Sequence, residues 1–193
     1  MGALIIVAPC LISPFYVYRG PKEKEYKTSE ALLNLLSEYS DRIKLFTYPC
    51  PEYELIGWPR PPMSKEVFMR LGMSERAKTI SEFIGRVIAE EKPEKIVFIG
   101  VKGSPTCGVF HTTSSDPDKF DHSFLKEFHR LTKEERIAHY TEILKRSGFR
   151  IVKGEGILFE ILKTKFSGAV YVEFDKDNIE ESLKRLKGVL EGL

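Results

Sequence analysis

The chain has 193 residues, of which 42% are hydrophobic and 30% charged, and its formal net charge is +2. This balance is typical of a globular protein with an ordinary core. The near-neutral charge argues against a nucleic-acid partner, because such proteins normally carry a strong basic excess. No run of 18 apolar residues is present, so we expect no membrane-spanning helix and a cytoplasmic location.

The first part of the chain alternates apolar segments with loops. Residues 3–9 form a continuous apolar run, which predicts a strand buried on both faces. After a polar loop we expect an amphipathic helix capped by Thr28 or Ser29. Residues 43–49 predict a second strand, and the proline-rich segment 50–64 predicts an irregular loop.

The middle of the chain contains its clearest helix and strand signals. A helix is predicted over 74–91 and a third strand over 95–102. The polar segment 103–123 predicts a long loop, and a helix should follow over about 124–147, with a break near 131–132.

The last part continues the alternation of strands and helices. Residues 149–153 predict a fourth strand, and 168–174 predict the last one. The sequence GEG at 154–156 opens another helix, whose N-terminus could hold an anion or a carbonyl group. A final helix is expected from Asp177, its predicted cap, to about residue 190.

This element order predicts an α/β fold. Alternation of strands and helices is typical of a mostly parallel sheet in a Rossmann-like or flavodoxin-like three-layer sandwich. We expect residues 1–193 to form a single domain, with a helical insertion at about 108–147. Neither GxGxxG nor GxxxxGK[ST] occurs, so no nucleotide-binding motif of those kinds is indicated.

The only three cysteines each follow a predicted strand. Cys10 follows the first, Cys50 the second and Cys107 the third. Carboxyl ends of parallel strands lie at one edge of a sheet, so we expect the three thiols to converge. The plainer alternative is that each is a small buried hydrophobe.

Two kinds of metal site are open to such a set. Zinc would need a fourth ligand, and His111 is the best placed histidine for that role. We expect the other three histidines, His122, His129 and His139, on the surface of the insertion. An iron–sulfur cluster held by three cysteines would leave one iron open, as a Lewis acid suited to a sulfur-bearing ligand.

Further candidates lie beside the cysteines. Glu52 could serve as a general base, or could simply form a loop salt bridge with Arg60. Ser104 precedes Cys107 in a tight turn that could present hydrogen-bond donors to a substrate, although such a turn can also be purely structural. Trp58 could stack on a base or close an edge of the core.

The motifs APC, CPE, PRPP, KGSPTCG and GEG together resemble those of the DUF523 family, whose members include the thiouracil desulfurases. The resemblance implies a Rossmann-like fold and a [4Fe–4S] cluster, and the positions that match its ligands are Cys10, Cys50 and Cys107. Glu52 and Ser104 match the catalytic positions. The segment after Cys10 and residues 111–147 depart from the family pattern.

The implied activity is removal of sulfur from a thiolated, 2-thiouracil-like pyrimidine, giving the oxo form and sulfide without redox change. Action on another small sulfur compound is a second possibility. A non-catalytic iron–sulfur or metal-binding sensor, or a sulfur carrier, is a third, and a relative whose thiols stay free is a fourth. A pocket beside the cysteines would favour the enzyme, and an exposed apolar patch on the insertion would favour the sensor.

Overall fold

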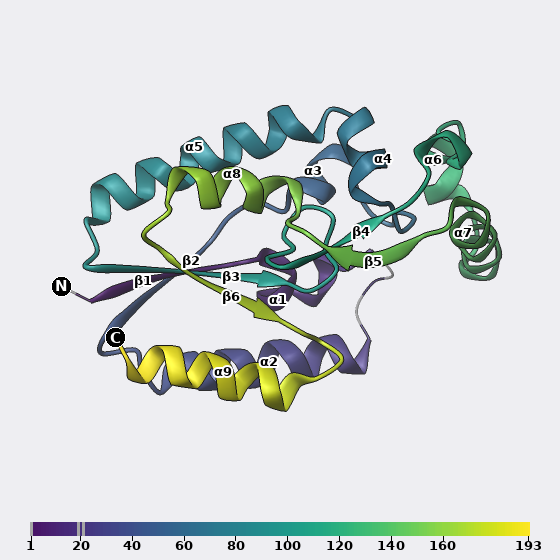
Figure 1. The fold of residues 1–193 in the computed structure, drawn as a ribbon. Coiled ribbons are helices and arrows are strands. Elements are labelled where there is room, and N and C mark those ends of the chain that lie inside the picture. The colour runs from purple at the N-terminus through teal and green to yellow at the C-terminus, as the bar shows by residue number, and fades with distance from the viewer. Residues whose placement is uncertain (1, 19, 21) are drawn as a thin grey trace.

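A computed structural model describes residues 2–18, 20 and 22–193 of the chain. Its centre is a four-stranded, fully parallel sheet in the order β2-β1-β3-β6 (Figure 1). The strands are β1 (Ala3–Val7), β2 (Ile43–Thr47), β3 (Lys95–Val101) and β6 (Val170–Phe174).

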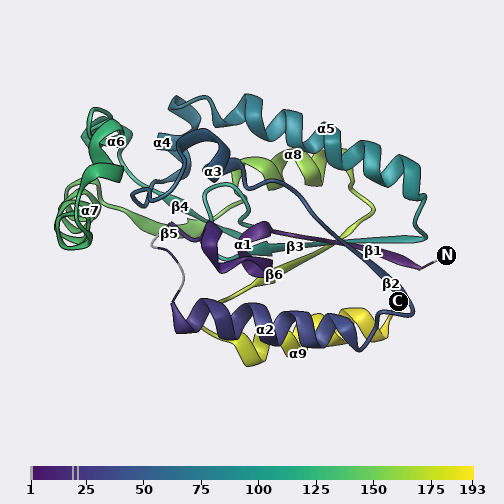
Figure 2. The same cartoon turned by 180° about the vertical axis from the view of Figure 1, so that it is seen from behind.

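Helices cover both faces of this sheet. Figures 1 and 2 show α2 and α9 on one face and α5 and α8 on the other, which confirms the predicted α/β three-layer class. The helices are α1 (Pro9–Ile12), α2 (Glu23–Ser37), α3 (Pro51–Ile56), α4 (Lys65–Arg70), α5 (Met73–Glu91), α6 (Phe124–Glu127), α7 (Lys133–Ser147), α8 (Ile157–Lys165) and α9 (Ile179–Glu191). Short 3-10 helices are η1 (Pro14–Tyr16), η2 (Pro117–Lys119) and η3 (Phe128–Arg130). No helix within the described ranges combines the length and apolar character needed to cross a membrane.

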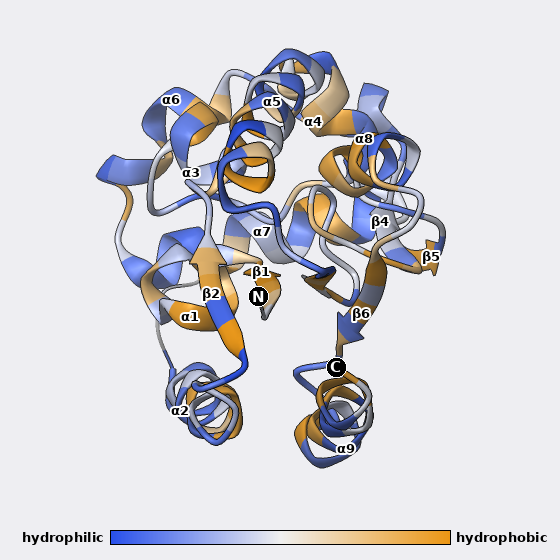
Figure 3. Cartoon of the chain, turned by 90° about the vertical axis from the view of Figure 1, so that its left-hand side faces the viewer, coloured by the Kyte–Doolittle hydropathy of each residue, from blue (hydrophilic) through white to orange (hydrophobic). Residues whose placement is uncertain are grey.

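The core lies between the sheet and the two helix layers. All five residues of β1 are buried, as expected of a central strand covered on both faces. Apolar side chains of β3 and of the helices complete it, and Figure 3 shows orange strand segments between the layers. This rigid core holds the carboxyl ends of three neighbouring strands in fixed register.

The predicted fourth strand does not join the main sheet. Its residues form β5 (Arg150–Lys153), which pairs in antiparallel fashion with β4 (His111–Ser114) in a separate two-stranded sheet. Arg150 and Ile151 are exposed, so this segment lacks the continuous apolar character of a strand buried on both faces. Figure 1 shows this small sheet beyond the carboxyl ends of the main strands, with α6 and α7 further out.

The segment 108–147, predicted to be a helical insertion, contains the strand β4 first and then helices. The predicted break is present, because η3 ends at Arg130 and α7 begins at Lys133. Thr132 and Glu135 form a reciprocal capping box at the start of α7, and Gly148 ends the helix with a φ of 64°.

Among the boundaries that differ from the sequence-based predictions, three have a clear local cause. Helix α2 begins at Glu23 rather than near Thr28, and the hydroxyls of Thr28 and Ser29 bond to carbonyl groups one turn earlier. The predicted irregular segment 50–64 begins with α3, which Pro51 can start because its missing N–H is not needed at the first helical position. The cap of α9 is Asn178, whose side chain accepts the N–H of Glu181, rather than Asp177.

Candidate active site

The three cysteines line one cavity of about 220 Å³ at the carboxyl edge of the sheet. Cys10 lies in α1 directly after β1, Cys50 is the N-cap of α3 after β2, and Cys107 lies in the loop after β3. None of the three is in a disulfide. Their convergence follows from the parallel register of three adjacent strands, and Glu52 and Ser104 line the same cavity.

Two of the thiols are buried and Cys10 is partly exposed. Burial, reinforced by the carboxylate of Glu52, raises the pKa of Cys50 to about 12. Burial and then the neighbouring Cys10 raise the pKa of Cys107 well above its ordinary value. The hydroxyl of Tyr48 lies 3.2 Å from the Cys107 Sγ. The two buried thiols, those of Cys50 and Cys107, therefore favour the protonated form unless a positively charged group binds beside them.

The SPTC turn sets the position of Cys107. The Ser104 Oγ accepts hydrogen bonds from the backbone N–H groups of Thr106, at 3.3 Å, and Cys107, at 2.9 Å. Gly103, with a φ of 72°, allows the chain to leave β3 in a conformation that other residues rarely adopt. Ser104 therefore shapes the loop that carries a thiol as well as facing the cavity.

The start of α8 packs against this same loop and forms hydrogen bonds with it. The GEG segment predicts a helix N-terminus that could bind an anion or a carbonyl group of a ligand, but N–H groups at this helix start are occupied by backbone carbonyl groups of the cysteine loop. A Cβ at Gly156 would come within 2.5 Å of the Thr106 backbone, so only glycine fits there. The bonds join Gly156 N to Gly108 O at 2.8 Å, Ile157 N to Pro105 O at 2.9 Å and Leu158 N to Thr106 O at 3.0 Å.

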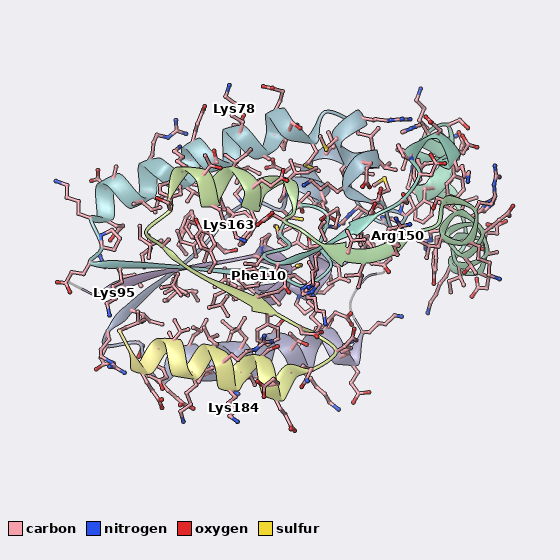
Figure 4. All side chains as sticks on the ribbon, in the orientation of Figure 1. Lys78, Lys95, Phe110, Arg150, Lys163 and Lys184 are labelled. Atoms are coloured by element: carbon pink, nitrogen blue, oxygen red, sulfur yellow. The ribbon has the colours of Figure 1, made fainter. Side chains whose placement is uncertain are left out.

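A buried carboxylate holds the chain just beyond Cys107. Glu173 of β6 accepts the backbone N–H groups of Val109, Phe110 and His111 at 3.1, 2.7 and 2.8 Å. The Lys163 Nζ donates to the Val109 carbonyl at 2.6 Å and lies 4.5 Å from the centre of the Phe110 ring (Figure 4). The loop is thus fixed from β6 and α8 together.

The histidines do not join the cysteine cavity. The His111 Nδ1 is 2.6 Å from the Glu173 Oε1. His111 is not among the residues that line the cysteine cavity. His122, His129 and His139 are exposed on the insertion, as expected. Within the described part of the chain, no group of three or more His, Cys, Asp or Glu residues surrounds a point that could hold a single metal ion. The arrangement therefore gives no support to a Cys3His zinc site.

Glu52 lies on α3, and both of its carboxylate oxygens are engaged. The Oε2 accepts from the Arg60 Nη2 at 2.8 Å, in an ion pair whose side chains are only 3% (Arg60) and 14% (Glu52) exposed. The Oε1 accepts from the Thr106 Oγ1 at 2.7 Å, and the Ser104 Oγ is 3.4 Å away. The salt bridge considered as the alternative to a catalytic role is present, but it lies at the cavity rather than on an open loop.

Several residues of the cavity were missed at the sequence level. Thr106 stands inside the SPTC motif, two residues after Ser104, so the motif itself was the available signal. Lys176 follows β6 at the same sheet edge, and its Nζ donates to the Cys10 carbonyl at 3.1 Å. Only the order of strands in the sheet, which places β6 beside β3, could have indicated it.

A second cavity of about 290 Å³ adjoins the first and lies against α7. Tyr18 and Arg60 line both cavities. Trp58 lines the second, is 47% exposed, and donates its indole N–H to the Val17 carbonyl at 3.3 Å. Trp58 therefore neither closes an edge of the core nor lines the cysteine cavity.

Fold and site together define an α/β protein with a thiol-lined cavity at the carboxyl edge of a parallel sheet. The family model described as "Putative 2-thiouracil desulfurase" matches residues 2–192. The chain therefore belongs to this family, in agreement with the resemblance of its motifs. No curated protein and no solved structure matches the chain.

Proposed function

We propose that this protein is an iron–sulfur-dependent desulfurase that removes sulfur from a thiolated pyrimidine such as 2-thiouracil. Water supplies the oxygen of the product, and the sulfur leaves as hydrogen sulfide with the two hydrogens of that water, so no redox partner is needed. The observation that carries the proposal is a single cavity lined by Cys10, Cys50, Cys107, Glu52 and Ser104. The name of the family points to the same substrate class.

The donor set fits a [4Fe–4S] cluster better than a single ion. Soft thiolate ligands select iron–sulfur clusters, zinc and copper(I). In a cubane cluster each cysteine binds a different iron, so the three sulfurs can lie around the cluster without meeting at one point. The three thiols line the same cavity but do not surround one ion position. Cys10, Cys50 and Cys107 would hold the cluster.

When bound by three cysteines, such a cluster supplies one iron with an open position, a Lewis acid for a thiocarbonyl sulfur. The protein's own residues would supply the rest. Glu52 takes a proton from the water that attacks the thiocarbonyl carbon, which is general-base chemistry. Ser104 donates its hydroxyl to the substrate and orients the ring. Burial of this wall of the cavity limits competing water.

The size and charge of the site favour a small substrate. The cavity volume of about 220 Å³ is below the range of about 300–1,000 Å³ for drug-sized ligands, and the cluster would occupy part of it, so the space left suits only a small substrate. The net charge of +2 gives no general attraction to nucleic acid. A free thiolated pyrimidine or a similarly small sulfur compound is the proposed partner.

The direct test is turnover. The protein would be purified without oxygen, reconstituted with iron and sulfide, and incubated with 2-thiouracil while uracil and sulfide are measured. We expect the two products in equal amounts. A reconstituted protein that retains its cluster but converts none of a panel of thiolated pyrimidines would contradict the proposal and favour a sensor or sulfur carrier.

A further inference from the structure

The carboxylate of Glu52 is held from two sides by two different buried donors. The Arg60 Nη2 bonds to one oxygen at 2.8 Å, and the Thr106 Oγ1 bonds to the other at 2.7 Å. Arg60 is 4% exposed and Thr106 is 1% exposed. Hydrogen bonds to a charged acceptor are short and strong, so the two donors together fix the plane of the carboxylate.

Arg60 is held in place by its surroundings, and its burial leaves two of its nitrogens without hydrogen-bond partners among the described residues. It stands in the PRPP segment between prolines whose φ angles are restricted, and its Nη2 also donates to the Tyr16 carbonyl at 3.0 Å. Its Nε and Nη1 are buried without a hydrogen-bond partner among the described residues. Such unpaired buried donors destabilise the folded state. A buried, under-satisfied guanidinium is therefore better explained by what it does to Glu52 than by a contribution to folding.

The two hydroxyls beside Glu52 differ in where their protons go. Each hydroxyl has a single proton to donate. That of Thr106 is committed to the carboxylate at 2.7 Å. The Ser104 Oγ accepts two backbone N–H groups, and its nearest acceptors, Glu52 Oε1 and Thr106 Oγ1, are both 3.4 Å away. Since strong O–H···O bonds span about 2.5–3.0 Å, the proton of Ser104 is only weakly engaged.

We propose that Arg60 and Thr106 are positioning residues that clamp Glu52, and that this division leaves the Ser104 hydroxyl as the donor to the substrate. The inference rests on the proposed function, in which Glu52 is the base. It adds that the orientation of Glu52 depends on a threonine and an arginine that need not touch the substrate. The clamp acts on the rate of the reaction rather than on substrate affinity, because it aligns the base with the attacking water.

The test compares kcat and KM across a matched set of variants. Thr106→Val removes the hydroxyl with little change of shape, and Thr106→Ser restores it. Thr28→Val is the control, because Thr28 is also 1% exposed but bonds to a backbone carbonyl within α2. We expect Thr106→Val to lower kcat about 10- to 100-fold with little change in KM, and Thr106→Ser and Thr28→Val to keep wild-type kcat. Thermal unfolding and iron content are recorded for every variant.

Wild-type kcat in Thr106→Val would overturn the inference, and so would an equal loss in Thr106→Ser. If Thr106→Val unfolds early or loses iron, Arg60→Lys decides, because it keeps the charge and loses the planar fork. A fall in kcat at constant KM in that variant supports the clamp, and wild-type kcat overturns it. Glu52→Gln distinguishes a failure of the proposed function from a failure of the clamp alone. Full activity there removes the base and the clamp together, whereas an inactive Glu52→Gln beside a fully active Thr106→Val removes the clamp alone.

Discussion

The guanidinium of Arg60 lies 2.8 Å from the carboxylate of Glu52 at the wall of the cysteine cavity, with both side chains largely removed from water. A pair in this setting is much more sensitive to the loss of one partner than an exposed pair is, because the remaining charge stays buried. A second ion pair, made by another glutamate of α3, provides a comparison. Glu54 lies 3.3 Å from Arg76, and both of those side chains are more than a third exposed.

The two glutamates of α3 should therefore differ in their effect on turnover. We expect Glu52→Gln to lower the rate of thiouracil conversion by at least about 100-fold, the usual loss when a general base is removed. Glu54→Gln should retain the wild-type rate, because its side chain faces solvent rather than the cavity. The measurement is uracil release by the reconstituted protein, with iron content checked for each variant. Similar rates for the two variants would remove Glu52 from the mechanism.

Close packing at Gly156 predicts a stability effect that acts on the cysteine loop. Gly156→Ala would drive a Cβ to within 2.5 Å of the Thr106 backbone, so we expect a loss of about 1–3 kcal/mol in the free energy of unfolding. Gly188→Ala is the control, because a Cβ added at Gly188 would meet no atom within 4 Å and α9 is helical there. That variant should be neutral or gain about 0.5–1 kcal/mol. Equal effects in urea unfolding would contradict the packing described for α8.

The buried carboxylate of Glu173 predicts a local change in hydrogen exchange. Glu173→Gln removes the charge that accepts three consecutive backbone N–H groups, so the amides of Val109, Phe110 and His111 should exchange faster with deuterium. Hydrogen bonds to a charged group contribute about 1.5–3 kcal/mol, and we expect the free energy of unfolding to decrease by an amount in that range. Glu180→Gln, on the exposed side of α9, should leave both measurements unchanged. Unaltered exchange at residues 109–111 would show that other contacts hold the loop.

The raised pKa of Cys50 predicts how the stability of the metal-free protein depends on pH. Its thiol titrates near pH 12 in the folded chain and near its ordinary value of about 8.5 when unfolded. The neutral thiol thus favours the fold below about pH 8.5, and this contribution is lost as the pH rises toward 12. Serine does not titrate in this range, so the stability difference between wild type and Cys50→Ser should shrink from pH 8 to pH 11. A constant difference in urea unfolding would contradict the effect of burial.

Much of the site could be predicted because it depends on strand order and on local motifs. Cys10 and Cys107 follow β1 and β3, whose apolar runs indicate buried strands, Cys50 follows the edge strand β2, and parallel strands bring their carboxyl ends together. The sequence also placed Glu52 and Ser104 beside two of these cysteines. The strand pattern and the local motifs were sufficient for this level of description.

What could not be predicted depends on contacts between segments distant in sequence. The pairing of β4 with β5 joins residues about 40 positions apart, and neither strand has an apolar run that indicates its partner. The direction of His111 depends on Glu173, which follows it by 62 residues. The commitment of the Thr106 hydroxyl to Glu52 likewise depends on geometry across 54 residues. Local sequence patterns carry no information about contacts between residues that are this distant in sequence.

Cys10, Cys50 and Cys107 are proposed to hold one iron–sulfur cluster together. The most direct measurement is iron and acid-labile sulfide per chain after anaerobic reconstitution, in the wild type and in each of the three Cys→Ala variants. We predict about four of each per wild-type chain, as in a [4Fe–4S] cluster, and a severe loss of both in every variant. Bound zinc, or iron and sulfide that persist in any one of the three variants, would contradict the claim.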